Sequence, residues 1–429
     1  MKNKSEKIML KKIIAVVVGV LAITASFFCG FFVKDCVNGS DINANNEILS
    51  YLEEYGVFNT KDLSIEKFSV SEITRSFVEN LKDDYAHYYT KEEYQKIKAN
   101  ADGEYDGVGI SAYKDSLKIY KVAVNSPAYH VGLLEGDQLK SGKYLSTQKV
   151  FESYADFDNF ILGLPENSNF TLTVQRDSTI KTMTLSKKHF ISTYVYYQDT
   201  EKALAYLGED GDVELVETYK KQQITDTSTA YVRFYQFEGD SARQLKNVLK
   251  YAVENGKTNL ILDLRHNGGG YMTVLEDVAS ILINVKANQS SVITYSLSAK
   301  GDYTPYTASS SGYVEGIENI SVIANEYTAS ASECLIGAML YYKNAFDIDR
   351  LIIENASLSS GKARTYGKGI MQTTFPLADG GALKLTTAII YQPDRATCIH
   401  NTGITVNGEN ALLVNSGNAL TRAQAVLNG

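Results

Sequence analysis

The stretch Asn259-Leu-Ile-Leu-Asp-Leu-Arg-His-Asn-Gly-Gly-Gly270 decides the fold of this chain. Its first six residues are mostly apolar and of strand length, which is typical of a strand buried inside a parallel sheet. Its last three residues are glycines that separate this strand from a predicted helix. Successive residues without Cβ let main-chain N–H groups turn outward toward an anion. The loop is therefore a phosphate cradle, an oxyanion hole or a tight turn, and it lacks the Lys-Ser/Thr ending of a nucleotide-binding P-loop.

The alternation of strand and helix continues on both sides of this stretch. The pattern predicts strands at 230–235 and 320–324, an amphipathic helix at 240–255 capped by Asp240, and a second helix after Gly270. Strands that alternate with helices indicate a partly parallel sheet, whose ligand sites lie beyond the carboxyl ends of the strands. We assign residues 229–429 to this core. Residues 191–228, which include an acidic stretch, are assigned to a linker at its start.

A second loop, Asn325-Glu-Tyr-Thr-Ala-Ser-Ala-Ser-Glu-Cys334, follows a predicted strand and precedes an apolar helix. Ser330 and Glu333 have the S-x-x-E spacing of a capping box, which makes Ser330 the predicted N-cap. Ser332 then falls in the first turn of the helix, where the dipole and the free N–H groups favour developing negative charge. Ser332 is therefore the candidate nucleophile, and a simple capped helix is the alternative.

A nucleophilic serine needs a base, and the sequence offers two kinds. None of the five histidines stands out, but His266 adjoins the glycine loop, so a Ser–His pair stays open. The other solution is a lysine that desolvation keeps neutral by lowering its pKa. Lys368 fits this role because it lies between two glycines, where the backbone can come close and shield the amine. Gln372 could hold that amine by hydrogen bonding.

The N-terminus carries a different signal. Residues 13–33 form an unbroken run without charge, long enough to cross a hydrocarbon core as a helix. The lysines that precede it are opposed only by Glu6, so residues 1–12 should stay in the cytoplasm. Because Phe27 and Phe28 stand where a signal peptidase needs small residues, we favour an uncleaved signal anchor over a cleaved signal peptide. In either case the rest of the chain lies outside the cell membrane.

The remaining sequence indicates the secondary structure before the core and gives no sign of nucleic-acid or metal binding. Residues 41–101 are polar and predicted to be helical, with a helix start at Thr90-Lys-Glu-Glu93, and residues 102–190 are rich in predicted strands. The net charge of −8 gives no reason to expect nucleic-acid binding. No pair of Cys or His has zinc-ligand spacing, so we expect neither a metal nor another cofactor. Cys334 and Cys398 are expected to be buried free thiols rather than a disulfide. The predicted fold class is α+β and multidomain.

Together these segments resemble the carboxyl-terminal processing peptidases, also called tail-specific proteases. The motifs that carry the resemblance stand in family order and are Phe77-Val-Glu-Asn-Leu-Lys-Asp-Asp-Tyr85, Gly107-Val-Gly-Ile110, Ser126-Pro-Ala128, Gly132-Leu-Leu-Glu-Gly-Asp137, Leu262-Asp-Leu-Arg-His-Asn-Gly-Gly-Gly270, Ser330-Ala-Ser-Glu333, Gly367-Lys-Gly-Ile-Met-Gln372 and Leu383-Lys-Leu-Thr-Thr-Ala388. Each motif alone is weak, but their joint order is specific. The resemblance implies an N-terminal helical element, a PDZ domain at 102–190 and an α/β peptidase core.

The resemblance also implies a serine endopeptidase of Ser–Lys type. Carried over to matching positions, Ser332 is the nucleophile, Lys368 its general base and Gln372 the residue that orients the lysine. A catalytically inactive, membrane-tethered peptide-binding scaffold is the competing hypothesis from another class. The complete Ser–Lys pair argues against it.

The oxyanion hole would combine the glycine loop with the amide of Glu333, which follows the serine. Many relatives have proline where this chain has Gly268, and proline has no N–H. The donor in the loop is therefore Gly269 or Gly270.

In the PDZ segment, the resemblance implies that the consecutive amides of Val108, Gly109 and Ile110 receive the terminal carboxylate of a substrate. The peptide would add as a strand to the edge of the sheet. The expected partners are protein substrates with free C-termini, beside the membrane. A PDZ fold that only braces the core is the alternative. The oligomeric state stays open, with a homodimer as one option.

Two segments depart from the family pattern. Residues 344–362 look like extra material that lengthens the spacing between Ser332 and Lys368. Residues 401–408 lack the Pro-Asp pair that is common in relatives. Neither departure removes a catalytic residue.

Overall fold

The computed structural model describes residues 75–76, 78–79, 83–101, 103–124, 126–206, 213–215, 222–288, 290–342, 350–354, 364–378, 380–405, 412–413 and 417–428. The chain divides into two compact units, Met1–Thr90 and Lys91–Gly429. The predicted membrane span at 13–33 lies outside the described residues. Within the described residues, no helix is long and apolar enough to span a bilayer.

The region predicted to be helical at 41–101 is helical only in part. In the first unit, residues 87–89 form the short strand β1 (His87–Tyr89), because the aromatic side chains of His-Tyr-Tyr favour extended backbone. In the second unit, α4 (Lys91–Ala101) begins within the predicted start signal and carries Glu92 and Glu93 in its first turn. Acidic side chains at this position stabilise the positive end of the helix dipole.

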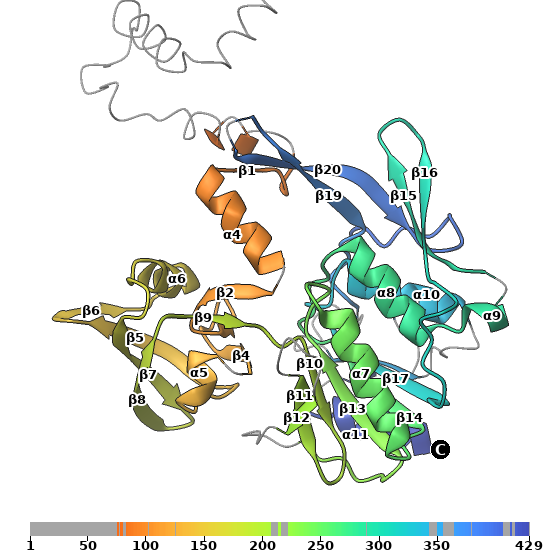
Figure 1. Cartoon of the computed structure of the whole chain (residues 1–429), viewed down its shortest axis with the longest axis horizontal. Coiled ribbons are helices and arrows are strands. Elements are labelled where there is room, and N and C mark those ends of the chain that lie inside the picture. Colours follow the sequence, from red (N-terminus) through yellow and green to blue (C-terminus); the bar gives the residue numbers. More distant parts are fainter. Residues whose placement is uncertain are drawn as a thin grey trace, which may run out of the picture. The chain divides into compact units, whose positions relative to one another are not determined.

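The strand-rich segment that follows, drawn from orange to yellow-green in Figure 1, has a hydrophobic core of its own. Its elements are β2 (Glu104–Gly107), β3 (Ile110–Ala112), β4 (Ile119–Val122), α5 (Pro127–His130), β5 (Gln138–Tyr144), β6 (Thr147–Val150), α6 (Tyr154–Leu162), β7 (Asn169–Arg176), β8 (Thr179–Ser186) and β9 (Lys188–Ile191). Phe170, Leu172 and Val174 alternate inward along β7 and pack against Phe157 and Ile161 of α6. The alternation of side chains along β7 therefore defines the buried face of this strand.

The predicted β-α-β core is a mixed sheet. Among the described residues it has eight strands in the order β12-β11-β10-β13-β14-β17-β18-β21. Their bounds are β10 (Val195–Gln198), β11 (Ala203–Tyr206), β12 (Val213–Leu215), β13 (Thr229–Phe234), β14 (Asn259–Asp263), β17 (Asn319–Asn325), β18 (Leu351–Glu354) and β21 (Leu412–Leu413). The strands from β13 to β21 pair in parallel, as predicted.

Two segments in which no strand was predicted contribute strands to this sheet. Residues 191–228, assigned to a linker at the start of the core, supply β10, β11 and β12. Residues 344–362, predicted as extra material, include β18, whose four side chains are all buried between its neighbours. Short apolar runs of this kind are difficult to recognise as strands because their partners lie far away in the sequence.

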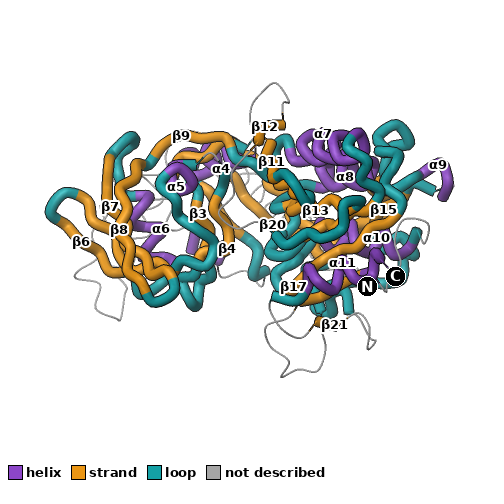
Figure 2. The backbone as a smooth tube through the Cα atoms, turned by 90° about the horizontal axis from the view of Figure 1, so that it is seen from below, coloured by secondary structure: helices purple, strands orange, loops and turns teal. Residues whose placement is uncertain are grey.

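Side chains alternate between the two faces of the core sheet. Along β13, Val232 packs with the helices α7 (Ser241–Glu254), α8 (Met272–Leu282) and α10 (Ala331–Tyr341). Tyr231 packs on the opposite face with α11 (Ala419–Asn428). Figure 1 shows α7 and α8 side by side, and Figure 2 shows them on one side of β13 with α11 on the other. Burial on both faces explains why these strands read as continuous apolar runs.

The helix α7 begins one residue after Asp240, as predicted, but that side chain makes no cap hydrogen bond. Its carboxylate pairs instead with Arg243 on the next turn. The expected side-chain cap is therefore wrong, although the position of the helix start is right.

A second, antiparallel sheet joins β16 (Tyr303–Thr307), β15 (Val292–Ser298), β20 (Ala382–Tyr391) and β19 (Ile370–Pro376) in this order. The short helix α9 (Val285–Asn288) precedes β15. Because β19 begins two residues after Lys368, this sheet fixes the direction in which the lysine loop leaves the core.

Candidate active site

The glycine loop lies at the carboxyl end of β14 and is locked by Asn267. This side chain is fully buried, donates from Nδ2 to the carbonyl of Phe234 (2.9 Å), and accepts the amide of Gly269 on Oδ1 (3.0 Å). The amide of Phe237 in turn donates to the carbonyl of Gly269 (2.9 Å). The loop is therefore held by the segment that follows β13, as expected for a site at the carboxyl edge of a parallel sheet.

Two of the three glycines are required by the geometry. Gly269 has φ +97°, and a Cβ there would stand 2.7 Å from Cβ of Ser330. Gly270 has φ +150°, and its Cβ would stand 2.2 Å from the carbonyl oxygen of Phe237. Gly268 faces open space, so a side chain fits there. Because the amide of Gly269 already donates to Asn267, Gly270 is the freer of the two predicted oxyanion donors.

The predicted nucleophile, Ser332, is fully buried in the first turn of α10. Its Oγ donates to the carbonyl of Asn267 at 3.1 Å, and the amide of Ala329 donates to the same carbonyl at 3.0 Å. Both bonds join the glycine loop to the start of α10. The catalytic role of Ser332 stays a prediction, and in this geometry its hydroxyl proton is directed at a backbone carbonyl.

Ser330 lies two residues earlier and has different surroundings. It is partly exposed and is the N-cap of α10, with a capping box to Glu333, as predicted. Its backbone has φ 57° and ψ −118°, a conformation that L-residues rarely adopt and that tends to occur at functional sites. A hydroxyl at a sharp strand-to-helix turn is the arrangement of a nucleophile elbow. Ser330 is therefore a second candidate nucleophile, which the capping-box pattern concealed.

Glu333 joins the two loops that carry the candidate nucleophile and the candidate base. Its buried carboxylate accepts the amide of Ser330 on Oε2 (2.9 Å). It also accepts the amides of Lys368 on Oε2 (2.9 Å) and of Gly367 on Oε1 (2.7 Å). One side chain thus fixes the backbone of Lys368 relative to that of Ser330, a role that the sequence did not reveal.

Lys368 is half-buried, and its surroundings favour the neutral amine. Burial is the main cause that lowers the pKa of Lys368, and the nearby ammonium of Lys384 lowers it further. The predicted orienting residue, Gln372, lies on β19 just after a β-bulge and donates to the hydroxyl of Thr386 at 3.4 Å. The contact of Gln372 with the amine of Lys368 stays a prediction.

The glycines beside Lys368 allow a neighbouring turn to approach, as predicted. A Cβ on Gly369 would stand 2.4 Å from the amide nitrogen of His400, and one on Gly367 would stand 2.9 Å from that of Gly403. The amide of Asn401 donates to the carbonyl of Gly367 at 2.8 Å. Residues 399–405, which overlap the segment 401–408 that departs from the family pattern, therefore pack directly on the lysine loop.

His266, the alternative base, is occupied elsewhere. Its Nε2 lies 2.9 Å from the hydroxyl of Tyr113 and 3.0 Å from Nδ2 of Asn325, and its ring stacks on Tyr120 and Tyr327 at 5.0 Å. Burial lowers the pKa of His266 to about 3, and the charge of Arg233 acts in the same direction. Among the described residues, no hydrogen bond links His266 to either serine, so the Ser–His alternative lacks structural support.

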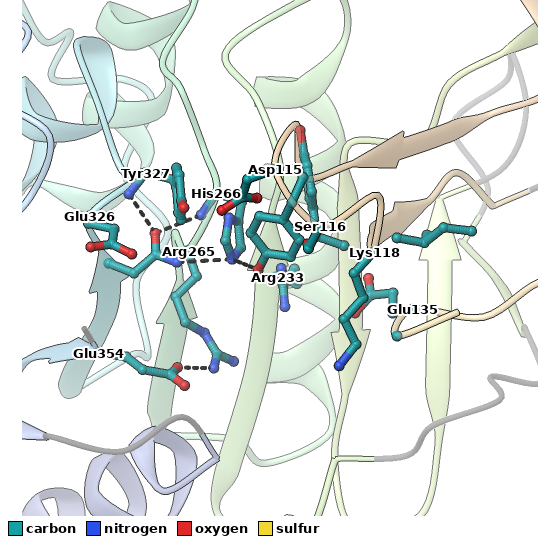
Figure 3. Close-up of a pocket in the computed structure, with 15 residues that line it drawn as sticks. Asp115, Ser116, Lys118, Glu135, Arg233, Arg265, His266, Glu326, Tyr327 and Glu354 are labelled. Atoms are coloured by element: carbon teal, nitrogen blue, oxygen red, sulfur yellow. Dashed lines mark hydrogen bonds and ion pairs between the residues drawn. The ribbon is translucent and has the colours of Figure 1, made fainter. Parts of the chain in front are cut away.

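His266 lines a cavity of about 490 Å³, drawn in Figure 3, that contains neither the predicted serine nor the predicted lysine. Arg233, Arg265 and Glu354, which also line this cavity, belong to a buried charge network around Asp263. Arg265 binds Asp263 (Nε to Oδ1, 3.0 Å) and pairs with Glu354, while Arg233 approaches Asp263 to 3.7 Å. Burial acts to raise the pKa of Asp263, but the two guanidinium groups outweigh it and hold that pKa well below its usual range. The network anchors the strand ends from which the glycine loop departs.

The three residues predicted to bind a substrate carboxylate lie together in a separate groove of about 300 Å³. Val108, Gly109 and Ile110 form one wall of this groove, and α6 forms another with apolar side chains that include Leu162. Gly109 has φ +78° and lies so close to Ser126 that a Cβ there would collide with it. The groove belongs to the strand-rich segment and opens beside Gln236 of the core.

Sequence reasoning missed the structural roles of Asn267 and of the Glu333 carboxylate. An Asn between a strand end and a run of glycines is a known turn signal, since its side chain can bond to the backbone two residues on. No local pattern marks the bonds from Glu333 to the lysine loop.

Cys334 and Cys398 are free thiols, as predicted; Cys334 is buried but Cys398 is partly exposed. The described residues contain no cluster of metal-ligating side chains.

A parallel sheet with a hydroxyl at a helix start, a half-buried lysine and an adjacent glycine loop defines a serine-hydrolase type of site. The model of peptidase family S41 matches residues 228–409, the part of the chain that holds this site. Residues 228–409 therefore match peptidase family S41, and the chain is a serine peptidase, in agreement with the family predicted from the motifs.

The curated relatives carry the same assignment. A "Probable CtpA-like serine protease" of Staphylococcus aureus (strain bovine RF122 / ET3-1) is 26% identical over 415 residues, which cover 94% of this chain and 73% of the relative. The protein of that name in Staphylococcus epidermidis (strain ATCC 12228 / FDA PCI 1200) is 26% identical over 412 residues, which cover 94% and 74%.

Solved structures agree on the fold. The photosystem II D1 C-terminal processing protease matches with a TM-score of 0.52 at 20% identity, over 91% of this chain and 98% of that one. A putative S41 protease from Bacteroides fragilis NCTC 9343 matches with a TM-score of 0.51 at 13% identity, over 89% and 96%. At these identities the likeness shows the fold alone, a mixed α/β peptidase fold.

Proposed function

We propose that this chain is a Ser–Lys endopeptidase that cleaves protein substrates through an acyl-enzyme. The observation that carries the proposal is the bridge made by Glu333, which binds the amides of Ser330 and Lys368 with the same carboxylate oxygen. A hydroxyl-bearing turn and a half-buried lysine are thereby held side by side, as a nucleophile and its base must be.

Geometry favours Ser330 over Ser332 as the nucleophile. Ser330 is partly exposed at a sharp turn, whereas Ser332 is fully buried and bonded to a carbonyl. The bond from Ser330 to Glu333 uses the backbone amide of Ser330, so the hydroxyl still has its proton to give to a base. The amide after the nucleophile is then that of Ala331, the first residue of α10, where helical N–H groups lack intrahelical acceptors. With Gly270 it would form the oxyanion hole.

In the proposed reaction, neutral Lys368 takes the proton from the hydroxyl as the oxygen attacks the substrate carbonyl. The negative charge that develops on the carbonyl oxygen is stabilised by the two amides, a contribution of about 3–4 kcal/mol for each well-placed donor. The protonated lysine then gives its proton to the leaving amine, and water hydrolyses the acyl-enzyme in the same way.

Alanine substitutions of the two serines test this assignment. Ser330→Ala should abolish peptide cleavage and labelling by a fluorophosphonate, while Ser332→Ala should keep both at a reduced level. Lys368→Ala should abolish cleavage without unfolding the protein. If Ser332→Ala is the inactive variant, the nucleophile is Ser332, as the motifs predicted. Cleavage that survives in both serine variants would refute the serine mechanism and leave peptide binding without turnover as the function.

We further propose that residues 102–190 form a PDZ domain whose groove captures substrate tails. The groove at Val108, Gly109 and Ile110 supports this, because it lies between a strand and a helix that leave room for an added peptide strand. Binding of a peptide with a free C-terminus should be lost when the same peptide is amidated, as measured by fluorescence anisotropy with Ser330→Ala. Equal affinity for both peptides would contradict tail capture.

For the N-terminal residues we propose a single membrane-spanning helix at 13–33, with residues 1–12 in the cytoplasm and the peptidase outside. The support is the uncharged run preceded by lysines. The full chain should remain in the membrane pellet after carbonate extraction, and its peptidase part should be digested by protease added to intact cells. Release by carbonate would contradict an integral anchor.

A further inference from the structure

Thr365 lies three residues before Lys368, and its hydroxyl donates one hydrogen bond and accepts another. It is fully buried. Its Oγ1 donates to Oε1 of Glu333 at 2.5 Å and accepts the amide of Ile404 at 2.7 Å. Because an amide N–H can only donate, the hydroxyl proton of Thr365 is directed to Glu333. The hydroxyl therefore connects the turn at 399–405 to the carboxylate that bridges both catalytic loops.

This connection completes the set of donors around Glu333. The oxygen Oε2 accepts the amides of Ser330 and Lys368, and Oε1 accepts the amide of Gly367 and the hydroxyl of Thr365. A buried carboxylate keeps one orientation only when its lone pairs are satisfied, since an unmet site is costly in a low-dielectric interior. Removal of the hydroxyl would leave Oε1 with one of these two donors.

The backbone around Thr365 strengthens the same junction. The amide of Thr365 donates to the carbonyl of Ile404 at 3.0 Å, so these two residues are joined by a backbone bond and a side-chain bond. Gly403 packs so closely that a Cβ on it would stand 2.5 Å from the carbonyl oxygen of Thr365. The turn at 399–405 thus reaches the bridging carboxylate through a single hydroxyl.

We infer that Thr365 is a positioning residue for catalysis, which sets the orientation of Glu333 and through it the spacing of Lys368 from the nucleophile. The inference rests on the proposed Ser–Lys function. Thr365 does not touch the substrate, so its effect should fall on the rate of the chemical step and not on substrate binding.

The test compares Thr365→Val, which keeps the shape but removes the hydroxyl, with Thr365→Ser, which retains it. In the full-length protein, Thr365→Val should lower kcat roughly 10- to 100-fold with KM unchanged, the range expected when a hydrogen bond to a charged group is lost. Thr365→Ser should stay within about threefold of the wild type. The rate of labelling by a fluorophosphonate should follow the same order.

Thr229→Val is the matched control. Thr229 is also fully buried and donates to a carboxylate, Oδ2 of Asp226 at 2.6 Å, but it lies at the amino end of β13, opposite the site. It should lower thermal stability about as much as Thr365→Val without changing kcat. If Thr365→Val fails to fold, Thr365→Cys, with a weaker donor, replaces it and should be at least tenfold slower than Thr365→Ser.

Three outcomes overturn the inference. A folded Thr365→Val with kcat within threefold of the wild type would do so, as would Thr365→Cys that matches Thr365→Ser, or Thr229→Val that loses as much kcat as Thr365→Val. A wild-type chain that neither cleaves peptides nor reacts with the fluorophosphonate would overturn the proposed function, and this inference with it. Activity of the wild type therefore separates the two failures.

Discussion

The lysine that serves as the proposed base depends on its neighbours for a usable protonation state. An ordinary lysine is charged at neutral pH and cannot accept a proton. Burial and the nearby Lys384 both lower the pKa of Lys368, so a larger share of its amine is neutral. Burial and the charge of Lys384 therefore set the pH range in which the proposed base is neutral.

Lys384→Gln should shift the pH dependence of activity to higher pH. The base must be neutral, so kcat/KM rises as Lys368 loses its proton, and removal of a neighbouring positive charge raises the pKa of Lys368. The variant should be slower than the wild type at pH 7 and reach a similar rate at higher pH. Lys250→Gln, at an exposed position on α7, is the control. An unshifted profile for Lys384→Gln would exclude this electrostatic effect.

The choice between the two serines is also made at the residue scale. The S-x-x-E pattern predicted the capping role of Ser330, and the structure contains it. The pattern carries no information on which hydroxyl is accessible, because accessibility depends on what packs over the turn. Asn267 of the glycine loop covers Ser332 and leaves Ser330 partly exposed.

At the scale of elements, the glycine loop matters through the close approach of two backbones. Gly269 lies against residues 329–331 in a left-handed conformation, whereas Gly268 faces open space. The structure distinguishes the three glycines by their contacts: Gly269 approaches the start of α10, Gly270 approaches Phe237, and Gly268 approaches neither.

Gly269→Ala should therefore lower activity roughly 100-fold, because the added Cβ displaces the loop from the helix start and moves the oxyanion donors. Gly268→Ala should keep near wild-type activity. Both effects can be measured as kcat/KM on one peptide substrate, with circular dichroism as the check on folding. Equal losses in the two variants would contradict the assigned roles.

The secondary-structure elements themselves were largely predictable. The strands β13, β14 and β17 and the helices α7 and α8 fall where apolar runs, helical periodicity and turn residues predicted them. The misses were short strands: β1 in a segment predicted as helix, β10 to β12 in a predicted linker, and β18 in predicted extra material. A strand of three or four residues has too few side chains to show a period, and its pairing partners are distant in the sequence.

At the scale of the whole molecule, the strand-rich segment and the peptidase core have separate hydrophobic clusters. The groove at residues 108–110 is lined in part by residues of the first cluster, and both serines lie next to Ala331 of the second. The proposed tail capture and the proposed cleavage can therefore be tested by separate substitutions.

Leu162→Glu should weaken tail binding and leave the chemical step intact. Leu162 lines the groove and is 54% exposed, so a carboxylate there repels the carboxylate of the substrate tail with little cost in stability. A loss of affinity of roughly two- to fivefold is expected for an exposed charge. Leu145→Glu, at a position that is 79% exposed on the turn between β5 and β6, is the control. An equal loss of affinity in the two variants would show that the C-terminal tail of the substrate binds elsewhere.

The sequence by itself determined the peptidase family and the partly parallel character of the core sheet, and it pointed to the loops that carry the proposed chemistry. These features follow from local periodicity and from motifs that each span a few residues. Only the tertiary structure decided which serine is accessible and what holds the two loops together. The physical reason is that Glu333 and Thr365 are separated by 32 residues in the chain, and a hydrogen bond between such distant groups leaves no trace in local sequence. The buried hydroxyl of Thr365 illustrates this, since it precedes a recognised motif and yet its role depends entirely on a carboxylate and an amide from elsewhere in the fold.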